Sequence, residues 1–186
     1  MTPRERSPFL QQVDHSGTGS AGDGRTIVEH GAQQPPVRTA IRLRARWQSG
    51  LKAFVAGFLS TLSFHQGMLA VLHGAGLVAR VSYSMAPTYP LHAPAVISLA
   101  FWGGVWAVAL SSVIGRRRAA WTYYGAWTVL GAVFPSLVAL FVVLPLKGAP
   151  IAGGWSPETI ATALLLNGVW GFGAALLLWG FEPGRR

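Results

Sequence analysis

The chain has 186 residues, of which 51% are hydrophobic and only 11% are charged, and its formal net charge is +9. Soluble domains carry about 25% charged residues, so this composition is typical of a protein whose solvent is partly lipid. The positive charge does not indicate nucleic-acid binding, because the basic residues flank apolar segments and no nucleic-acid motif lies among them. The lack of cysteine excludes disulfides, thiolate metal sites and cysteine nucleophiles.

The N-terminal part of the chain is polar. Residues 1–37 are rich in Gly, Ser, Gln and Pro and show no apolar period, which predicts a disordered tail, with a docking segment as the alternative. In the basic juxtamembrane segment 38–50, Arg38, Arg42 and Arg46 recur every four residues and share one helical face. This face predicts contact with the anionic lipid headgroups of a bilayer, on its cytoplasmic side.

Four apolar segments follow within residues 51–181, at about 51–78, 94–115, 121–145 and 157–181. Each reaches the roughly 20 residues that a helix needs to cross a hydrocarbon core of about 30 Å. Backbone polar groups in lipid must be satisfied within the segment, so the predicted fold class is all-α, with four transmembrane helices. A cleaved signal peptide is a weaker interpretation of the first segment, because its apolar stretch is too long and no A-x-A site follows.

The connecting segments predict a helix start and an orientation. A capping serine, a proline and an acid at 156–158 predict that the fourth helix begins there. Most basic residues lie on one side of the predicted bundle, including the lipid-contact candidates Arg116, Arg117 and Arg118, whereas Arg80 and Lys147 lie on the other. This asymmetry predicts that both termini lie on the cytoplasmic side, with residues 182–186 forming a cytoplasmic tail.

Three polar side chains share a depth near the middle of the predicted bundle. His65 and Gln66 lie roughly 20 Å from the inner end of the first helix, and Asn167 lies similarly deep in the fourth. A polar group facing lipid has no partner, so all three are expected to face the interior. One interpretation is hydrogen bonding between helices, and the other is a site for a proton, a solute or a cofactor. The lack of Asp, Glu, Lys and Arg in the middle of every segment disfavours an ion-coupled site.

No cofactor, metal site or enzyme activity is predicted. Haem needs two axial ligands, and His65 and His73 lie about 12 Å apart along one helix, too far apart to share an iron. Metal binding by His73 and His92 lacks an accompanying carboxylate. The chain carries no P-loop, dinucleotide fingerprint, G-x-S-x-G or H-E-x-x-H motif.

Small residues recur at helical spacing in the second and fourth apolar segments. Gly103, Gly104, Gly168 and Gly171 are candidate helix-packing positions, because a missing side chain lets two backbones approach closely. In the third segment, Pro135 lacks an N–H donor and is expected to disturb the helix.

A weak internal similarity suggests two helical hairpins in tandem. The Gly-Val-Trp triplets at 104–106 and 168–170 match, and residues 72–75 resemble residues 146–149 more loosely. If the hairpins are repeats, the two triplets are expected to occupy equivalent positions in the bundle.

The stretches FHQGMLAVLHGAG, YSMAPTYP and ISLAFWGGVWAV resemble a group of small four-helix inner-membrane proteins of proteobacteria. The resemblance spans roughly residues 51–181 and implies a fold and a location, but no activity and no site residues. The leading functional prediction is a structural or accessory subunit that packs as a homo-oligomer or within a larger membrane complex. The alternatives are a proton or small-solute pathway through His65, Gln66 and Asn167, and a haem or other cofactor-binding membrane protein.

Overall fold

A computed structural model describes residues 36–114 and 119–181, with only the helical backbone described over 36–43. Within these residues, four helices are long and apolar enough to cross a membrane: Arg44–Gly74, Ala95–Val113, Ala120–Leu146 and Pro157–Gly180. The predicted tail falls outside the described residues except for its last two positions. The arginine triplet 116–118 and the C-terminal residues 182–186 also lie outside them.

The first span is one continuous helix made of α1 (Pro36–Ser60), η1 (Thr61–His65) and α2 (Gln66–Gly74). The helix already covers the predicted juxtamembrane segment. The middle element, η1, is a π-turn, in which the backbone N–H of Gln66 donates to the carbonyl five residues back. The span ends at Gly74, four residues before the predicted end.

A Schellman motif explains where the first span ends. Gly76 adopts a left-handed φ of +73°, and its N–H donates to the His73 carbonyl at 3.0 Å. The N–H of Leu77 donates to the Leu72 carbonyl, also at 3.0 Å. These two bonds satisfy the last helical carbonyls and turn the chain away from the helix axis.

The second and fourth spans are α3 (Ala95–Val113) and α7 (Pro157–Gly180), each within two residues of the predicted bounds. The predicted helix start at 156–158 is confirmed. The Ser156 hydroxyl accepts a hydrogen bond from the backbone N–H of Thr159 at 3.3 Å, and Pro157 occupies the first turn.

The third span consists of α4 (Ala120–Val138), η2 (Ala139–Val143) and α5 (Leu144–Leu146). Pro135 lies inside α4, where it cannot donate a backbone hydrogen bond, and a second π-turn, η2, begins four residues later. The helix is therefore irregular in this half, in line with the expected disturbance.

The third span ends in the same way as the first. The N–H of Gly148 (φ +75°) donates to the Pro145 carbonyl at 2.9 Å, and the N–H of Ala149 donates to the Leu144 carbonyl at 3.0 Å. Two glycines, Gly76 and Gly148, thus hold equivalent positions in two Schellman motifs. The match of 72–75 with 146–149 read from the sequence is out of register by two residues.

The four spans pack in the order α4, α7, α1 and α3. The last span, α7, packs along both α4 and α1, whereas α3 packs mainly along α1 and touches α4 only slightly. The two Gly-Val-Trp triplets therefore do not occupy equivalent positions in the bundle, and that expectation is wrong. Each triplet still lies on the second helix of its own hairpin.

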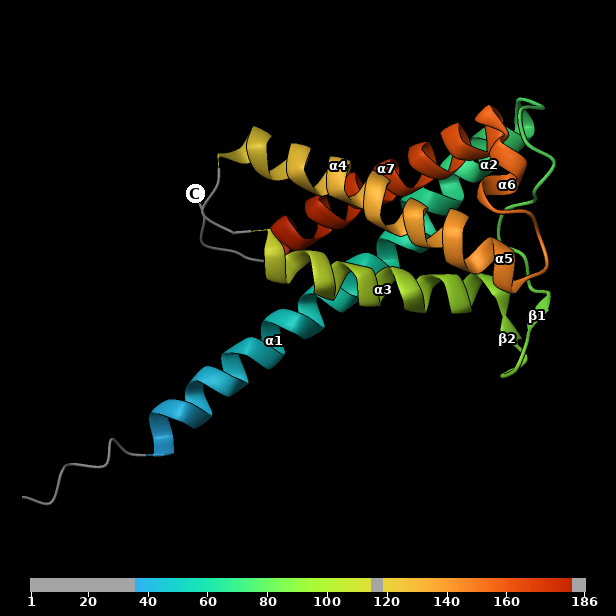
Figure 1. The fold of residues 1–186 in the computed structure, drawn as a ribbon. Coiled ribbons are helices and arrows are strands. Elements are labelled where there is room, and N and C mark those ends of the chain that lie inside the picture. Colours follow the sequence, from blue (N-terminus) through green and yellow to red (C-terminus); the bar gives the residue numbers. More distant parts are fainter. Residues whose placement is uncertain (1–35, 115–118, 182–186) are drawn as a thin grey trace, which may run out of the picture. The chain divides into compact units, whose positions relative to one another are not determined.

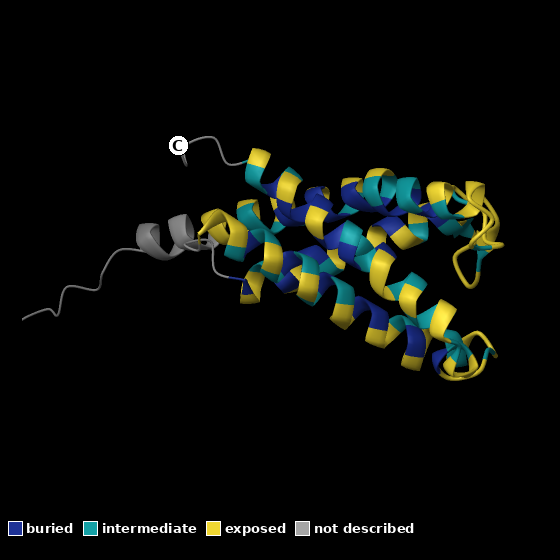
Figure 2. Ribbon diagram, turned by 90° about the horizontal axis from the view of Figure 1, so that it is seen from above, coloured by how far each residue is buried: buried dark blue, intermediate teal, exposed yellow. Residues whose placement is uncertain are grey.

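The buried residues lie on the faces that the helices turn toward one another (Figure 2). A core cluster draws on all four spans and includes Leu110 of α3, Trp127 of α4, and Trp170 and Leu178 of α7. Trp127 is the largest fully buried side chain among the described residues. The outward faces carry apolar side chains, as expected where the surrounding medium is hydrocarbon.

One end of the bundle carries two connecting segments, 75–94 and 147–156, which we call the loop end (Figure 1). The first segment contains two short strands, β1 (Pro87–Thr88) and β2 (Ala93–Pro94), which pair antiparallel. The second contains one short turn, α6 (Ala152–Trp155).

Candidate functional site

The side chain of Gln66 connects the first span to the loop end. Gln66 is only 3% exposed, and its Oε1 accepts a hydrogen bond from the backbone N–H of Tyr83 at 2.8 Å. The Tyr83 hydroxyl donates to the backbone carbonyl of Leu62 at 2.9 Å. These two hydrogen bonds hold the segment 75–94 against the first span.

The π-turn explains why the Leu62 carbonyl receives a side-chain donor. In a regular α-helix this carbonyl would accept from the N–H of Gln66, but that N–H donates to Thr61. Tyr83 itself has a left-handed φ of +53°, which is uncommon for an aromatic residue. A strained residue persists when its surroundings hold it, and here the bonds to Leu62 and Gln66 do so.

His65 is the last residue of the π-turn and is 8% exposed. Its Nδ1 atom is buried and has no hydrogen-bond partner among the described residues. A buried polar atom without a partner is costly. Among the described residues, the other such side-chain atom is Nε1 of Trp127 in α4.

Asn167 forms a separate polar contact. Its Nδ2 donates to the hydroxyl of Ser136 at 2.9 Å, which ties α7 to α4 beside Pro135. Within the described residues, no hydrogen bond joins Asn167 to His65 or Gln66. The three polar residues therefore do not form one site: Gln66 contacts the segment 75–94, His65 Nδ1 has no partner, and Asn167 joins α7 to α4.

A third group of polar contacts lies where α1, α3 and α7 meet, and we call it the three-helix junction: Gly57, Ser60, Thr61, Gly103 and Trp170. The carbonyl of Gly57 accepts from Trp170 Nε1 and from the Thr61 hydroxyl, each at 3.0 Å. The Ser60 hydroxyl donates to the Trp170 carbonyl at 2.7 Å. A Cβ atom on Gly103 would overlap the Thr61 hydroxyl and lie 3.1 Å from Trp170 Nε1.

The other candidate packing glycines also face helices of the same chain. A Cβ atom on Gly104 would lie 2.6 Å from the ring of Phe54, and one on Gly171 would overlap the carbonyl of Trp127. Gly168 is less crowded, with 3.4 Å to the side chain of Ala132. All four candidate glycines thus contribute to packing within the protomer.

The basic candidates for lipid contact are only partly described. Arg46 is exposed on α1. Arg38 and Arg42 lie on the same helix, but their side chains are outside the description, as are all of Arg116, Arg117 and Arg118. Their contact with headgroups stays a prediction.

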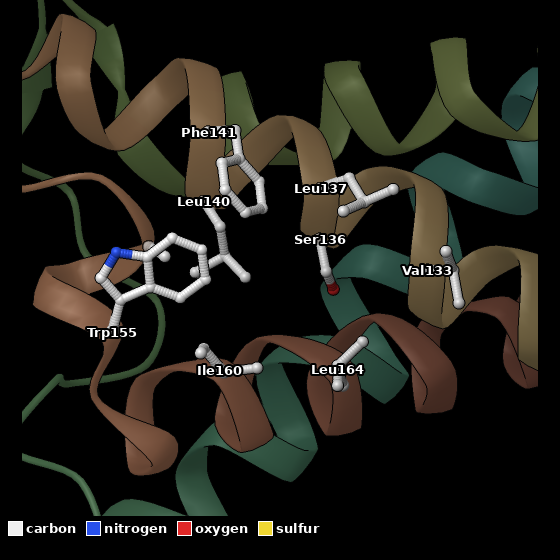
Figure 3. A pocket seen from close by; sticks show the side chains of 9 residues that line it. Val133, Ser136, Leu137, Leu140, Phe141, Trp155, Ile160 and Leu164 are labelled. Carbon is white, nitrogen blue, oxygen red and sulfur yellow. The ribbon is translucent and has the colours of Figure 1, made fainter.

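Sequence reasoning missed an apolar pocket of about 210 Å³ in the second hairpin, bounded by α4, η2, α6 and α7. Figure 3 shows its lining side chains, among which Ser136 supplies a hydroxyl. The turn α6 has a sequence signal, the pair Gly153-Gly154, but nothing in the sequence connects that pair to α4.

Comparisons with protein-family models, with curated proteins and with solved structures find no match for this chain. The resemblance to small four-helix inner-membrane proteins therefore stays a prediction. Within the described part of the chain, no group of three His, Cys, Asp or Glu residues is placed to hold a metal ion.

Proposed function

We propose that this chain is a structural or accessory membrane protein, which acts by packing with copies of itself or within a larger membrane complex. The observation that supports this proposal is that several polar side chains inside the spans form hydrogen bonds to other parts of the same chain. Ser60, Trp170 and Asn167 form hydrogen bonds from one span to another, and Gln66 binds the segment that covers it. Such contacts hold helices together and leave few polar groups to line a path.

The outward face of α3 supports the same proposal. This helix lies at one edge of the packing order and exposes bulky side chains, including Phe101 (50%) and Trp102 (57%). Because the candidate glycines pack internally, contact with another protein would fall on such bulky side chains. Large aromatic residues are common anchors of protein interfaces.

The proposal includes a location in a bacterial cytoplasmic membrane, with the loop end outside. The distribution of charge supports the orientation, since Arg80 and Lys147 are the only Lys or Arg residues of the loop-end segments 75–94 and 147–156. The resemblance to inner-membrane proteins supports the kind of membrane. Because the chain has no cysteine, single cysteines can report the topology. An impermeant maleimide applied to intact cells should label Ser84→Cys and leave Gln48→Cys unlabelled. The reverse pattern would contradict this orientation.

Native mass spectrometry of the full chain, extracted in a mild detergent, tests the accessory proposal. We expect a defined homo-oligomer or a complex with another membrane protein. Trp102→Ala should weaken that assembly at least fivefold, whereas Trp121→Ala, at an exposed tryptophan of α4, should leave it intact. A protomer without a partner, both in detergent and after crosslinking in native membranes, would contradict the proposal.

A second candidate function is a proton or small-solute pathway, which is favoured by the buried and unpartnered Nδ1 of His65. Proteoliposomes with an internal pH dye would measure proton flux through the wild-type chain and through His65→Leu. The pathway requires wild-type flux above that of empty liposomes and its loss in the variant. Equal flux in both proteins would exclude His65 from any such path.

A further inference from the structure

The apolar pocket in the second hairpin is built from four elements. One wall comes from α4 and η2, through Leu137 and Phe141, and the facing wall comes from the first two turns of α7, through Ile160 and Leu164. The turn α6 closes the end, where Trp155 packs edge-on against Phe141 with ring centroids 5.8 Å apart. Figure 3 shows these side chains converging on the space between the helices.

The turn α6 holds this end of the pocket in a strained backbone. Ala152, Gly153, Gly154 and Trp155 all have left-handed φ values, between +52° and +70°. L-residues avoid this conformation, and consecutive left-handed residues are rarer still. The turn buries Ala152 completely and places Trp155 over the pocket. Strain of this kind is concentrated at ligand clamps and other functional sites.

The chemistry of the walls excludes water as the natural occupant. The Ser136 hydroxyl already accepts a hydrogen bond from Asn167, and Figure 3 shows the benzene side of the Trp155 indole turned toward the space. An ordered water needs two to four polar partners, which these walls do not supply. The pocket therefore suits a hydrocarbon occupant.

The pocket is open to the medium around the spans. Leu137, Phe141 and Leu164 line it and remain 46%, 43% and 38% exposed. Leu164 lies about 10 Å along α7 from its first residue, which places this wall at the depth of acyl chains. Trp155, 66% exposed, marks the end nearest the membrane surface, where tryptophan is favoured.

We infer that this pocket binds one acyl chain of a phospholipid from the leaflet at the loop end. The chain enters beside Trp155, with its headgroup at the membrane surface, and lies between η2 and α7 against Leu137 and Leu164. The left-handed turn α6 fixes Trp155 as the wall nearest the headgroup. This inference concerns lipid bound to the protomer and does not depend on the proposed accessory role.

A phospholipid with a diazirine in the middle of one acyl chain is the probe. The full chain is reconstituted with this lipid, irradiated, digested and mapped by mass spectrometry. Adducts on residues 133–141 and 160–164 should exceed those on the lipid-facing helix α3 at least fivefold. Leu164→Trp, which fills the pocket, should lower the pocket adducts at least fivefold.

Leu99→Trp is the matched control, because Leu99 lies on α3 with 37% exposure and does not line the pocket. It should leave the pocket adducts unchanged. Leu137→Trp blocks the pocket from the opposite wall and serves as a second blocking variant. If circular dichroism shows that Leu164→Trp folds poorly, Leu137→Trp should still lower the pocket adducts at least fivefold. Pocket adducts no more frequent than those on α3, or unaffected by both blocking variants, would overturn the inference. Crosslinks from the pocket to a second copy of the chain would overturn it in favour of a protein occupant.

Discussion

The three-helix junction and the loop end differ in how their backbone and polar groups are satisfied. At the junction, the hydroxyls of Ser60 and Thr61 and the indole of Trp170 all have hydrogen-bond partners, and no space is left beside Gly103. At the loop end, several residues are left-handed, and a pocket stays open beside α6.

The difference indicates which part of the molecule carries stability and which is available for binding. Residues with a strained backbone or an unpartnered polar atom cluster where a protein binds or moves. Well-packed contacts elsewhere offset the stability that such residues cost. The same hairpin architecture thus combines a closed junction with an open end. The following substitutions test this comparison, from the largest expected effect to the smallest.

Gly103→Ala should have the largest effect, because the new methyl group overlaps the Thr61 hydroxyl and crowds the Gly57 carbonyl. We expect a loss of about 3 kcal/mol in the free energy of unfolding, typical of strong overpacking. Unfolding in mixed detergent micelles, followed by circular dichroism, measures it. Gly125→Ala is the control, because its methyl group meets nothing within 4 Å, and it should be neutral or slightly stabilising.

Trp170→Phe should cost about 1–2 kcal/mol, because it removes the indole donor to the Gly57 carbonyl and part of a buried side chain. The same unfolding assay applies. Trp106→Phe changes the tryptophan of the other Gly-Val-Trp triplet, which is only partly buried, and should cost less. Equal losses in the two variants would argue against a special role for the junction.

Gly154→Ala should cost about 1 kcal/mol through backbone strain alone, since φ is +70° and the nearest atom to the new methyl group is 3.9 Å away. Gly67→Ala, in the regular part of the first span with no atom within 4 Å, should shift stability in the opposite direction. A neutral Gly154→Ala would mean that α6 is not held left-handed in solution.

Tyr83→Phe should have the smallest effect on global stability, about 0.6 kcal/mol, because it removes one hydrogen bond to Leu62 and keeps the backbone bond to Gln66. Its local effect should be clearer. Hydrogen exchange of residues 75–94 should become faster, while exchange at the junction stays unchanged. Tyr89→Phe, at a 91% exposed tyrosine of the same segment, should leave that exchange unaltered.

The sequence was sufficient for the features that depend on local chemistry. Four long apolar runs predicted four spans, and Ser156 and Pro157 predicted the start of α7, since capping depends on neighbouring residues. The end of the first span could also have been predicted, because a glycine just after an apolar helix is a stop signal and Gly76 is such a glycine.

The features that depend on tertiary contacts were not predictable from one sequence. The sequence predicts a shared depth for His65, Gln66 and Asn167, but the direction of each side chain is set by the π-turn and by helix rotation. The hydrogen bonds of Tyr83 join the segment 75–94 to the first span, and the pocket beside α6 brings α4 and α7 together. No local sequence pattern connects these segments. The central position of α7 likewise depends on which glycine faces which helix.

That central position has a consequence for biosynthesis. The helix α7 is the last of the four spans to leave the ribosome, yet it packs between the two helices that begin the hairpins. Until it arrives, the hydroxyls of Ser60 and Ser136 lack their partners on α7 and can bind only carbonyls of their own helices. A nascent chain of three spans therefore lacks the helix that joins its two hairpins, and the bundle can close only after α7 is inserted.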